Sequence, residues 1–138
     1  MTAFHFEITS PEKLVFSGEV DQVDLPGYEG DFGVLAGHRP TIAALRPGIV
    51  TVWTGRSVER FVVMGGLAEV TPAQLTVLAD ICEPLDTFDL ANLNAQIDEM
   101  EHCLKDMPLG DELNRVITRL DHFKTLHQQL RLPQATAF

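Results

Sequence analysis

The apolar residues of this chain repeat with two different periods, and the period changes near Asp86. Before that point they alternate with polar residues in short runs, of which residues 4–8 are the first, and Gly, Pro and Asp interrupt the runs. Alternation is typical of half-buried β-strands. After Thr87 the apolar residues recur in steps of three and four, which is typical of amphipathic helices. The sequence therefore predicts a β domain over residues 1–86 and a helical domain over residues 87–138.

The β domain contains six or more short runs, and their spacing favours a sandwich or a flattened barrel over a layered α/β sheet. The runs are 4–8, 20–25, 41–45, 49–54, 58–64, 67–71 and 75–80. Gly55 is suited to the positive φ of a tight hairpin turn at Thr54-Gly55-Arg56. The stretch Met64-Gly65-Gly66-Leu67 has two interpretations. It is a turn or bulge where a Cβ would clash, or a backbone against which another subunit packs closely.

Two amphipathic helices are predicted in the second domain. The first has its apolar stripe at Leu90, Leu93, Ile97, Met100, Leu104 and Met107, and the second, from about Asp111 to Arg131, at Leu113, Val116, Ile117, Leu120, Phe123, Leu126 and Leu130. Asp89 or Thr87 can cap the first helix, and Pro108-Leu109-Gly110 ends it. The short break favours an antiparallel pair, which must pack its single apolar side on the β domain or on something outside the chain. Residues 133–138 are expected to form a frayed tail.

Charge limits the kinds of partner. The 138 residues include 10 Lys and Arg against 20 Asp and Glu, a net charge of −10. This charge repels the phosphates of nucleic acids and the anionic face of a membrane, so we expect neither nucleic-acid binding nor direct lipid binding. No apolar run approaches the ~20 residues of a membrane-spanning helix, so membrane association must go through a protein partner. The first residues have no basic flank and no cleavage site, and we expect the chain to stay in the cytoplasm.

No pattern of residues indicates catalysis or metal binding. Neither a nucleophile with its base nor a pair of carboxylates has a local signature. The acidic residues between 21 and 31 lack the spacing of a calcium loop, and the neighbouring glycines lack the lysine of a phosphate loop. Cys82 and Cys103 stand alone and are interpreted as structural thiols. We therefore expect no catalytic residue, no metal and no cofactor.

Four sequence blocks stand in a characteristic order and spacing. They are Ser10-Pro11-Glu12, Phe16-Ser17-Gly18, the run Leu25-Pro26-Gly27-x-Glu29-Gly30-Asp31-Phe32-Gly33-Val34-Leu35-x-Gly37-His38, and Met64-Gly65-Gly66-Leu67-x-Glu69-Val70. With these blocks the chain resembles the ε subunit of the bacterial rotary ATP synthase, from Phe4 to about Asp80 by motif and over the hairpin by length and helical pattern. The resemblance implies a ten-strand β-sandwich followed by an antiparallel two-helix hairpin, in agreement with the two periods.

The resemblance also implies a function. Subunits of this family have no active site. They bind the γ subunit in the central stalk, rest their sandwich on the membrane-embedded c-ring and turn with the rotor of a proton-driven F-type synthase. The implied location is peripheral, at the cytoplasmic face of the inner (plasma) membrane. The residues that match ring-facing loops are Ser10, Glu29, Asp31 and His38. The alternative is a free-standing β-sandwich module that binds a small ligand or a peptide.

The hairpin has two regulatory roles in the family. A basic second helix can contact the α and β subunits of the catalytic head and slow ATP hydrolysis. Here Arg115, Arg119 and Lys124 supply cations, but acidic residues of the same helix offset their positive charge. We therefore expect weak or absent inhibition. Some members bind ATP through a motif of the form [IL]-D-x-x-R-A. The equivalent stretch keeps Asp89 but has Asn92 in place of the arginine, which removes the cation that would meet a phosphate and argues against ATP sensing.

Overall fold

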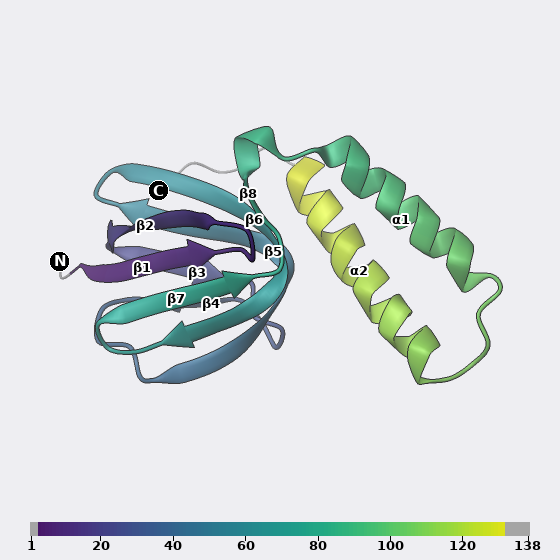
Figure 1. Cartoon of the computed structure of the whole chain (residues 1–138), viewed down its shortest axis with the longest axis horizontal. Helices are drawn as coiled ribbons and strands as arrows, with labels where there is room; N and C mark the ends of the chain where they lie inside the picture. The colour runs from purple at the N-terminus through teal and green to yellow at the C-terminus, as the bar shows by residue number, and fades with distance from the viewer. Residues whose placement is uncertain (1–2, 132–138) are drawn as a thin grey trace. The chain divides into compact units, whose positions relative to one another are not determined.

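A computed structural model describes residues 3–131 of the chain as a β-sandwich followed by a helical hairpin (Figure 1). The strands are β1 (Phe4–Thr9), β2 (Leu14–Val20), β3 (Gln22–Leu25), β4 (Phe32–Val34), β5 (Thr41–Thr54), β6 (Ser57–Val70), β7 (Gln74–Ala79) and β8 (Cys82–Pro84). A 3₁₀ turn, η1 (Leu85–Thr87), precedes α1 (Leu90–Leu104) and α2 (Asp111–Arg131). The predicted tail at 133–138 lies outside the described residues.

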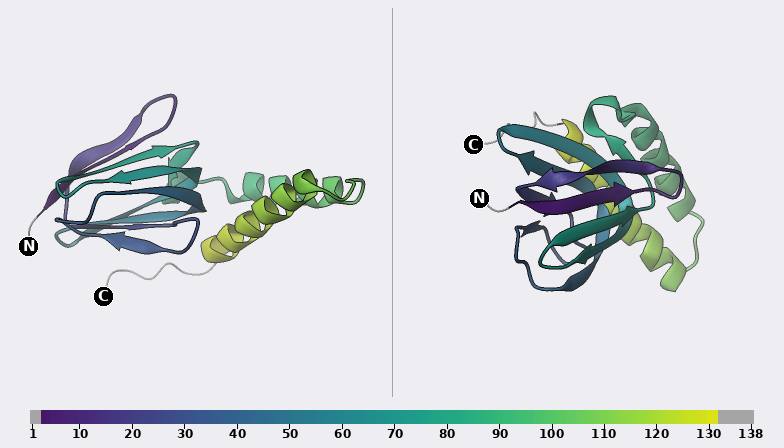
Figure 2. Two further views of the ribbon diagram at one scale, coloured as in Figure 1. Left: turned by 90° about the horizontal axis from the view of Figure 1, so that it is seen from below. Right: turned by 60° about the vertical axis from the view of Figure 1, so that its left-hand side comes forward.

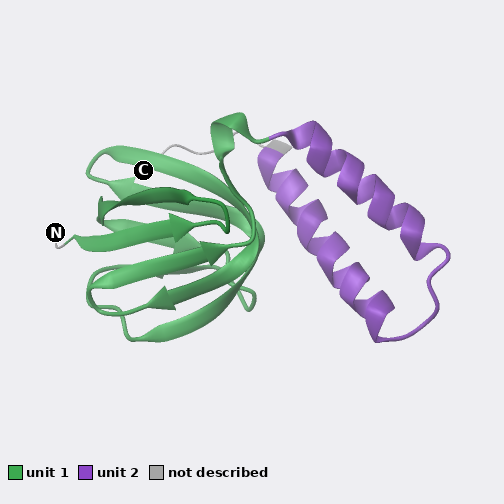
Figure 3. Cartoon of the chain, in the orientation of Figure 1, with its two compact units in different colours: residues 1–88, 137 green, residues 89–136, 138 purple. Residues whose placement is uncertain are grey.

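The chain divides into two compact units, one ending at Phe88 and a second beginning at Asp89 (Figure 3). This division and the predicted domain boundary after Asp86 both fall between β8 and α1. No helix within residues 3–131 combines the length and the apolar character required to cross a lipid bilayer.

The strands pair in the order β2-β1-β7-β6-β5-β3-β4, and β8 also pairs with β6. All neighbours are antiparallel except β1 and β7, which are parallel. Figure 2 shows these strands as facing layers, and the alternate apolar residues of each strand fill the space between them. No polar or charged side chain in the described part of the chain is buried. The prediction of a β-sandwich followed by two helices is confirmed.

Two long strands replace four of the predicted runs. β5 joins the runs 41–45 and 49–54, and β6 joins 58–64 and 67–71. The described residues therefore form eight strands, fewer than the ten that the family resemblance implies. The prediction of separate runs was wrong because the Pro and Gly residues between them bend a continuous strand instead of ending it.

Gly66 explains the bend in β6. Its φ is +141°, and a Cβ at this position would lie 2.3 Å from the carbonyl oxygen of Leu78. Only glycine allows β6 to approach the neighbouring strand this closely. Of the two interpretations of Met64-Gly65-Gly66-Leu67, a local bend where a Cβ would clash is the one that the structure supports.

The hairpin turn between β5 and β6 forms where it was predicted. Thr54 pairs with Ser57, so the loop consists of Gly55 and Arg56, and Gly55 has a φ of +60°. A positive φ at the first loop residue alone is the pattern of a type II′ turn. The backbone N–H of Gly55 donates to the carboxylate of Asp21 at 2.6 Å, which fixes the turn to the bend between β2 and β3.

The helices begin and end close to their predicted limits. The carboxylate of Asp89 accepts the backbone N–H of Asn92 at 3.0 Å and caps α1, so Asp89 rather than Thr87 is the cap. Gly110, with a φ of +153°, precedes α2. The buried side chains of this unit all belong to the predicted apolar stripes, and they are Leu93, Ile97, Leu120, Phe123 and Leu126.

Candidate functional site

The four predicted ring-contact residues lie in three loops of the sandwich. Ser10 begins the turn between β1 and β2, where its N–H donates to the carbonyl of Lys13 at 2.9 Å. Glu29 and Asp31 lie in the loop between β3 and β4, and His38 lies in the loop between β4 and β5. All four positions are at the surface or half-buried, as a contact role requires.

These loops do not all meet at one point. Ser10 follows Thr9, which pairs with Leu78 near the end of β7. The loop that carries His38 donates a backbone hydrogen bond of 2.8 Å to the carbonyl of Pro72, which precedes the start of β7. Ser10 and His38 therefore lie near opposite ends of β7. A partner that contacts both must extend along this strand.

Arg46 fixes the loop between β3 and β4. One guanidinium nitrogen donates to the carbonyl of Gly27 at 2.6 Å, and another contacts the carboxylate of Asp31 at 2.5 Å. The Arg46 side chain is only 17% exposed, whereas that of Asp31 is 67% exposed. The loop also donates from the N–H of Tyr28 to the carbonyl of Ala44 at 2.8 Å. The loop is therefore attached to β5 by both side-chain and backbone hydrogen bonds.

Glu29 differs from Asp31 in its surroundings. It is exposed and forms no hydrogen bond or ion pair with any other residue in the described range 3–131. It lines a groove of about 570 Å³ between residues 27–32 and residues 41–44 of β5. The carboxylate of Glu29 is thus available to a partner, while that of Asp31 holds its own loop in place.

His38 is oriented by its own loop. Its Nδ1 lies 2.7 Å from the carbonyl oxygen of Arg39, so Nδ1 carries the proton and donates. The hydroxyl of Thr41 donates to the same carbonyl at 3.0 Å. Because Nδ1 is occupied, Nε2 is the ring nitrogen with which His38 can contact a partner.

Strand register creates an apolar row on the outer face of the sheet. Leu67 pairs with Ala44 on β5 and with Leu78 on β7. The row continues through Thr9 of β1 to Leu14 of β2. Leu67 is 42% exposed, and both Leu78 and Leu14 are 55% exposed. Four of the five residues are apolar, with Thr9 as the exception, and we call the five the outer apolar row.

Two cations of the helical hairpin have partners within the hairpin. The guanidinium of Arg119 lies 5.1 Å from the centre of the Phe123 ring, and Nζ of Lys124 lies 3.7 Å from the carboxylate of Glu101 on α1. Arg115 is exposed on α2. Two of the three cations predicted to be regulatory are therefore engaged with neighbouring side chains.

The residues of the incomplete ATP motif form the start of α1. Asp89 uses its carboxylate for the helix cap, and Asn92 contributes its backbone N–H to that cap. Within the described residues, no group of three or more His, Cys, Asp or Glu side chains is arranged to hold a metal ion.

Comparison with known proteins identifies the family. The family profile described as "ATP synthase, Delta/Epsilon chain, beta-sandwich domain" matches residues 3–85. The chain is 55% identical to the ATP synthase epsilon chain 2 of Nitrobacter hamburgensis over all of both chains. The chain belongs to the ATP synthase epsilon chain family. It is also 56% identical to the epsilon chain of a Bradyrhizobium species, over 94% of this chain and 96% of the other.

Solved structures share the fold of this family. A chain in the mitochondrial ATP synthase of Euglena gracilis matches 95% of this chain, with 81% of its own length covered, 23% identity and a TM-score of 0.73. A chain of the Tetrahymena thermophila mitochondrial ATP synthase central stalk and c-ring structure matches 95% of this chain at 13% identity, with a TM-score of 0.66.

Family membership confirms two predictions from the sequence: the resemblance itself, and the interpretation of the chain as a non-catalytic subunit of an ATP synthase. The alternative of a free-standing binding module loses its support, because the similarity to epsilon chains extends over the full length of this chain.

Two features of the site were missed in the sequence. Arg46 contacts residues 15 and 19 positions away, and no local pattern connects it to them. The outer apolar row combines residues from five strands and depends on register alone. The sequence offered one signal for the role of Arg46: it is a single basic residue between two predicted apolar runs.

Arg46→Met should destabilise the β-sandwich by about 1–3 kcal/mol, because the Gly27 carbonyl and the Asp31 carboxylate lose their donor. Asp31→Asn is the matched control. It retains an acceptor for Arg46, and its ion pair is largely exposed, so it should cost less than about 1 kcal/mol. Urea unfolding of the two variants measures the difference. Equal losses would show that Arg46 does not hold the loop through Gly27.

Proposed function

We propose that this ATP synthase subunit is part of the rotor, where it couples the γ subunit of the central stalk to the c-ring of a proton-driven enzyme. Family membership supports this role, and so do the two structural neighbours, which belong to assemblies that contain a c-ring and, in one of them, the central stalk. Coupling of this kind requires a stiff body with two contact surfaces and no reactive groups. A subunit between these partners is peripheral to the membrane, and we place it at the cytoplasmic face of the inner (plasma) membrane.

The outer apolar row supports a contact with the γ subunit. Adjacent strands lie about 4.8 Å apart, so side chains paired across neighbouring strands form a continuous strip. Leu67, Leu78 and Leu14 are each more than two-fifths exposed in this strip. Exposed apolar residues that lie side by side are typical of surfaces that a protein partner covers. We therefore assign the γ contact to this face of the sheet.

Leu67→Ser and Leu78→Ser should each raise the dissociation constant for the purified γ subunit roughly tenfold, since an interface leucine contributes about 1–2 kcal/mol. The unfolding free energy should change by less than about 0.5 kcal/mol because both side chains are exposed. Calorimetric titration of γ with each variant measures the effect.

Leu109→Ser is the matched control for both substitutions. Leu109 is 93% exposed and lies between α1 and α2, so it belongs to the second compact unit and not to a sandwich strand. It should bind γ with unchanged affinity. Unchanged affinity in the Leu67 and Leu78 variants would refute the assignment of this face to γ.

The loop between β3 and β4 supports a contact with the c-ring. Glu29 offers a free carboxylate from a loop that Arg46 and Asp31 hold in one conformation. A fixed loop can transmit force without deforming, which suits a contact that must turn with the ring. We propose that Glu29 contacts the ring directly, that Asp31 contributes by holding the loop, and that Ser10 and His38 also belong to the ring contact.

Glu29→Ala should lower ATP-driven proton pumping by membranes about threefold to tenfold, equivalent to about 1 kcal/mol of lost contact energy. ATP hydrolysis should persist, because the residue takes no part in that chemistry. Glu59→Ala, which removes an exposed carboxylate from β6 instead, is the control and should pump normally. Normal pumping by the Glu29 variant would exclude it from the ring contact.

The hairpin supports at most weak control of the catalytic head. Arg119 and Lys124 already interact with Phe123 and Glu101, so contact with the α and β subunits would require these interactions to be exchanged. Arg115 is the remaining predicted cation, and one cation supplies little attraction to an acidic partner.

Removal of residues 89–138 should therefore change the ATPase rate of the assembled enzyme by less than about twofold, equivalent to about 0.4 kcal/mol in activation free energy. The core of the sandwich ends at Cys82, so the remaining unit retains it. Steady-state hydrolysis by enzyme reconstituted with the full or the shortened chain measures the ratio. A rise of tenfold or more would establish strong inhibition by the hairpin.

A further inference from the structure

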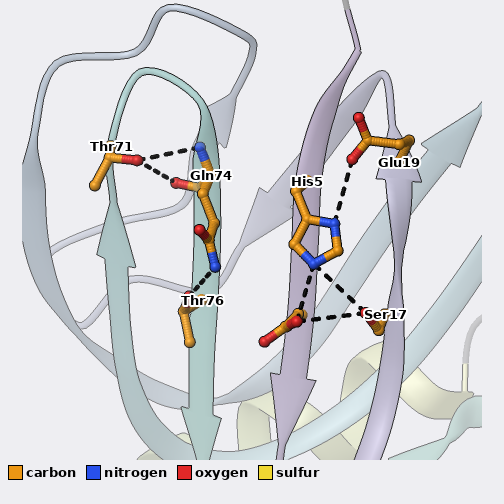
Figure 4. Close-up of polar contacts among 7 residues, drawn as sticks. His5, Ser17, Glu19, Thr71, Gln74 and Thr76 are labelled. Carbon is orange, nitrogen blue, oxygen red and sulfur yellow. Dashed lines mark hydrogen bonds and ion pairs between the residues drawn. The ribbon is translucent and has the colours of Figure 1, made fainter.

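A histidine lies between two glutamates on the outer face of the sheet, where β1 meets β2 (Figure 4). His5 Nε2 is 2.9 Å from a carboxylate oxygen of Glu7, and Nδ1 is 3.2 Å from a carboxylate oxygen of Glu19. The hydroxyl of Ser17 lies 3.5 Å from both Nε2 and the Glu7 carboxylate. One imidazole ring therefore joins a carboxylate of β1 to a carboxylate of β2.

His5 and Glu7 occupy positions of the β1–β2 ladder that alternate with the backbone-paired positions Phe4, opposite Val20, and Phe6, opposite Gly18. His5 is directly opposite Glu19, and Glu7 is opposite Ser17. The N–H of His5 donates to the carbonyl of Ala73, on the side of β7, and therefore points away from β2. In an antiparallel pair, residues whose backbone groups point away from each other have the closest side chains. The side chains of His5, Glu7 and Glu19 consequently add a second link between β1 and β2, beside the backbone hydrogen bonds of the flanking residues.

β2 depends on this link more than an interior strand would. It is at one end of the strand order, and among the strands of residues 3–131 it is paired in the sheet with β1 alone. Edge strands open more readily than interior strands because they are paired on one side only. A change in the His5 cluster therefore acts on a strand at one end of the strand order.

The number of protons on His5 decides how many of these hydrogen bonds can form. An imidazolium ring donates from both nitrogens, whereas a neutral ring has one N–H. Glu7 and Glu19 are acceptors when ionised, so the neutral ring can satisfy only one of them. The other carboxylate then faces a ring nitrogen that carries a lone pair.

We propose that His5, Glu7 and Glu19 form a proton-operated clamp on the edge strand β2, closed when the imidazole carries two protons and released when it carries one. The clamp is independent of the proposed rotor function, because it follows from the pairing of β1 with β2. It also differs from a metal site, since the two carboxylates approach opposite nitrogens of the ring instead of converging on one point.

The three described strands around His5 present no Lys or Arg that would oppose a second proton. The neighbouring strand β7 presents Gln74 and Thr76 to this face, and both are neutral. Glu69 of β6 lies opposite Thr76, one strand further away. β1, β2 and β7 contain no Lys or Arg.

The pKa of His5 is raised above its ordinary value of 6.5, with the hydrogen bond to Glu7 as the largest cause. Desolvation opposes this rise, and the hydrogen bond and charge of Glu19 add to it. A group with a raised folded-state pKa stabilises the folded form fully below its unfolded pKa. That contribution is lost as the pH rises through the folded-state pKa, so the clamp releases toward alkaline pH.

Two measurements on the full chain test the clamp. NMR titration should give His5 a pKa above 6.5 in the unaltered chain and a value at or below 6.5 in the Glu7→Gln/Glu19→Gln variant. Hydrogen exchange should give β2 amides lower protection factors at about pH 8.5 than at about pH 5.5. If the pKa of His5 falls by about one unit when β2 opens, the protection factors change about tenfold between these pH values.

His5→Gln should abolish the difference in β2 protection between the two pH values. Glu69→Gln is the matched control: it removes a carboxylate from the same face without contacting His5, and it should retain both the raised pKa and the pH dependence. A His5 pKa at or below 6.5 in the unaltered chain would overturn the proposal. The proposal would also be overturned if β2 of the His5→Gln variant lost as much protection between the two pH values as β2 of the unaltered chain. If His5→Gln fails to fold, the doubly substituted variant decides by the same two measurements.

Discussion

The pairing of β5 with β6 is the interaction on which the rest of the sandwich depends. These two strands pair from Thr41 and Val70 through to the turn at Gly55, and every other part of the sheet attaches to one of them directly or through a neighbour. β6 changes partner from β8 to β7 along its length, and it can do so because Gly66 permits the bend. The positions of the loops that carry the candidate contact residues therefore depend on this pair of strands.

The function of the chain rests on how firmly surfaces are held, because there is no reaction for side chains to perform. Arg46 attaches the loop of Glu29 to β5, and Asp21 attaches the β5–β6 turn to the start of β3. Both are single charged groups that use backbone carbonyl or N–H partners, which are fixed in position by the sheet. A sandwich with loops anchored in this way can carry force between partners.

Charge and apolar character divide the outer face of the sheet. The outer apolar row crosses five strands at one level, while His5, Glu7, Glu19 and Glu69 lie at the adjacent levels toward the start of β1. The apolar strip suits a permanent protein contact, which removes it from water. The polar cluster remains responsive to solvent, since the protonation of a histidine between two carboxylates changes with pH.

The sequence alone determined the two domains, both helices, the hairpin turn at Gly55 and the family. These features depend on neighbours a few residues apart, whose period, turn chemistry or motif spacing is visible in the chain. Only the tertiary structure decided that Pro and Gly bend β5 and β6 without ending them, that Arg46 holds Asp31, and that Leu14, Leu67 and Leu78 share one row. Each of these depends on strand register between distant segments, and register is fixed by the packing of the whole sheet.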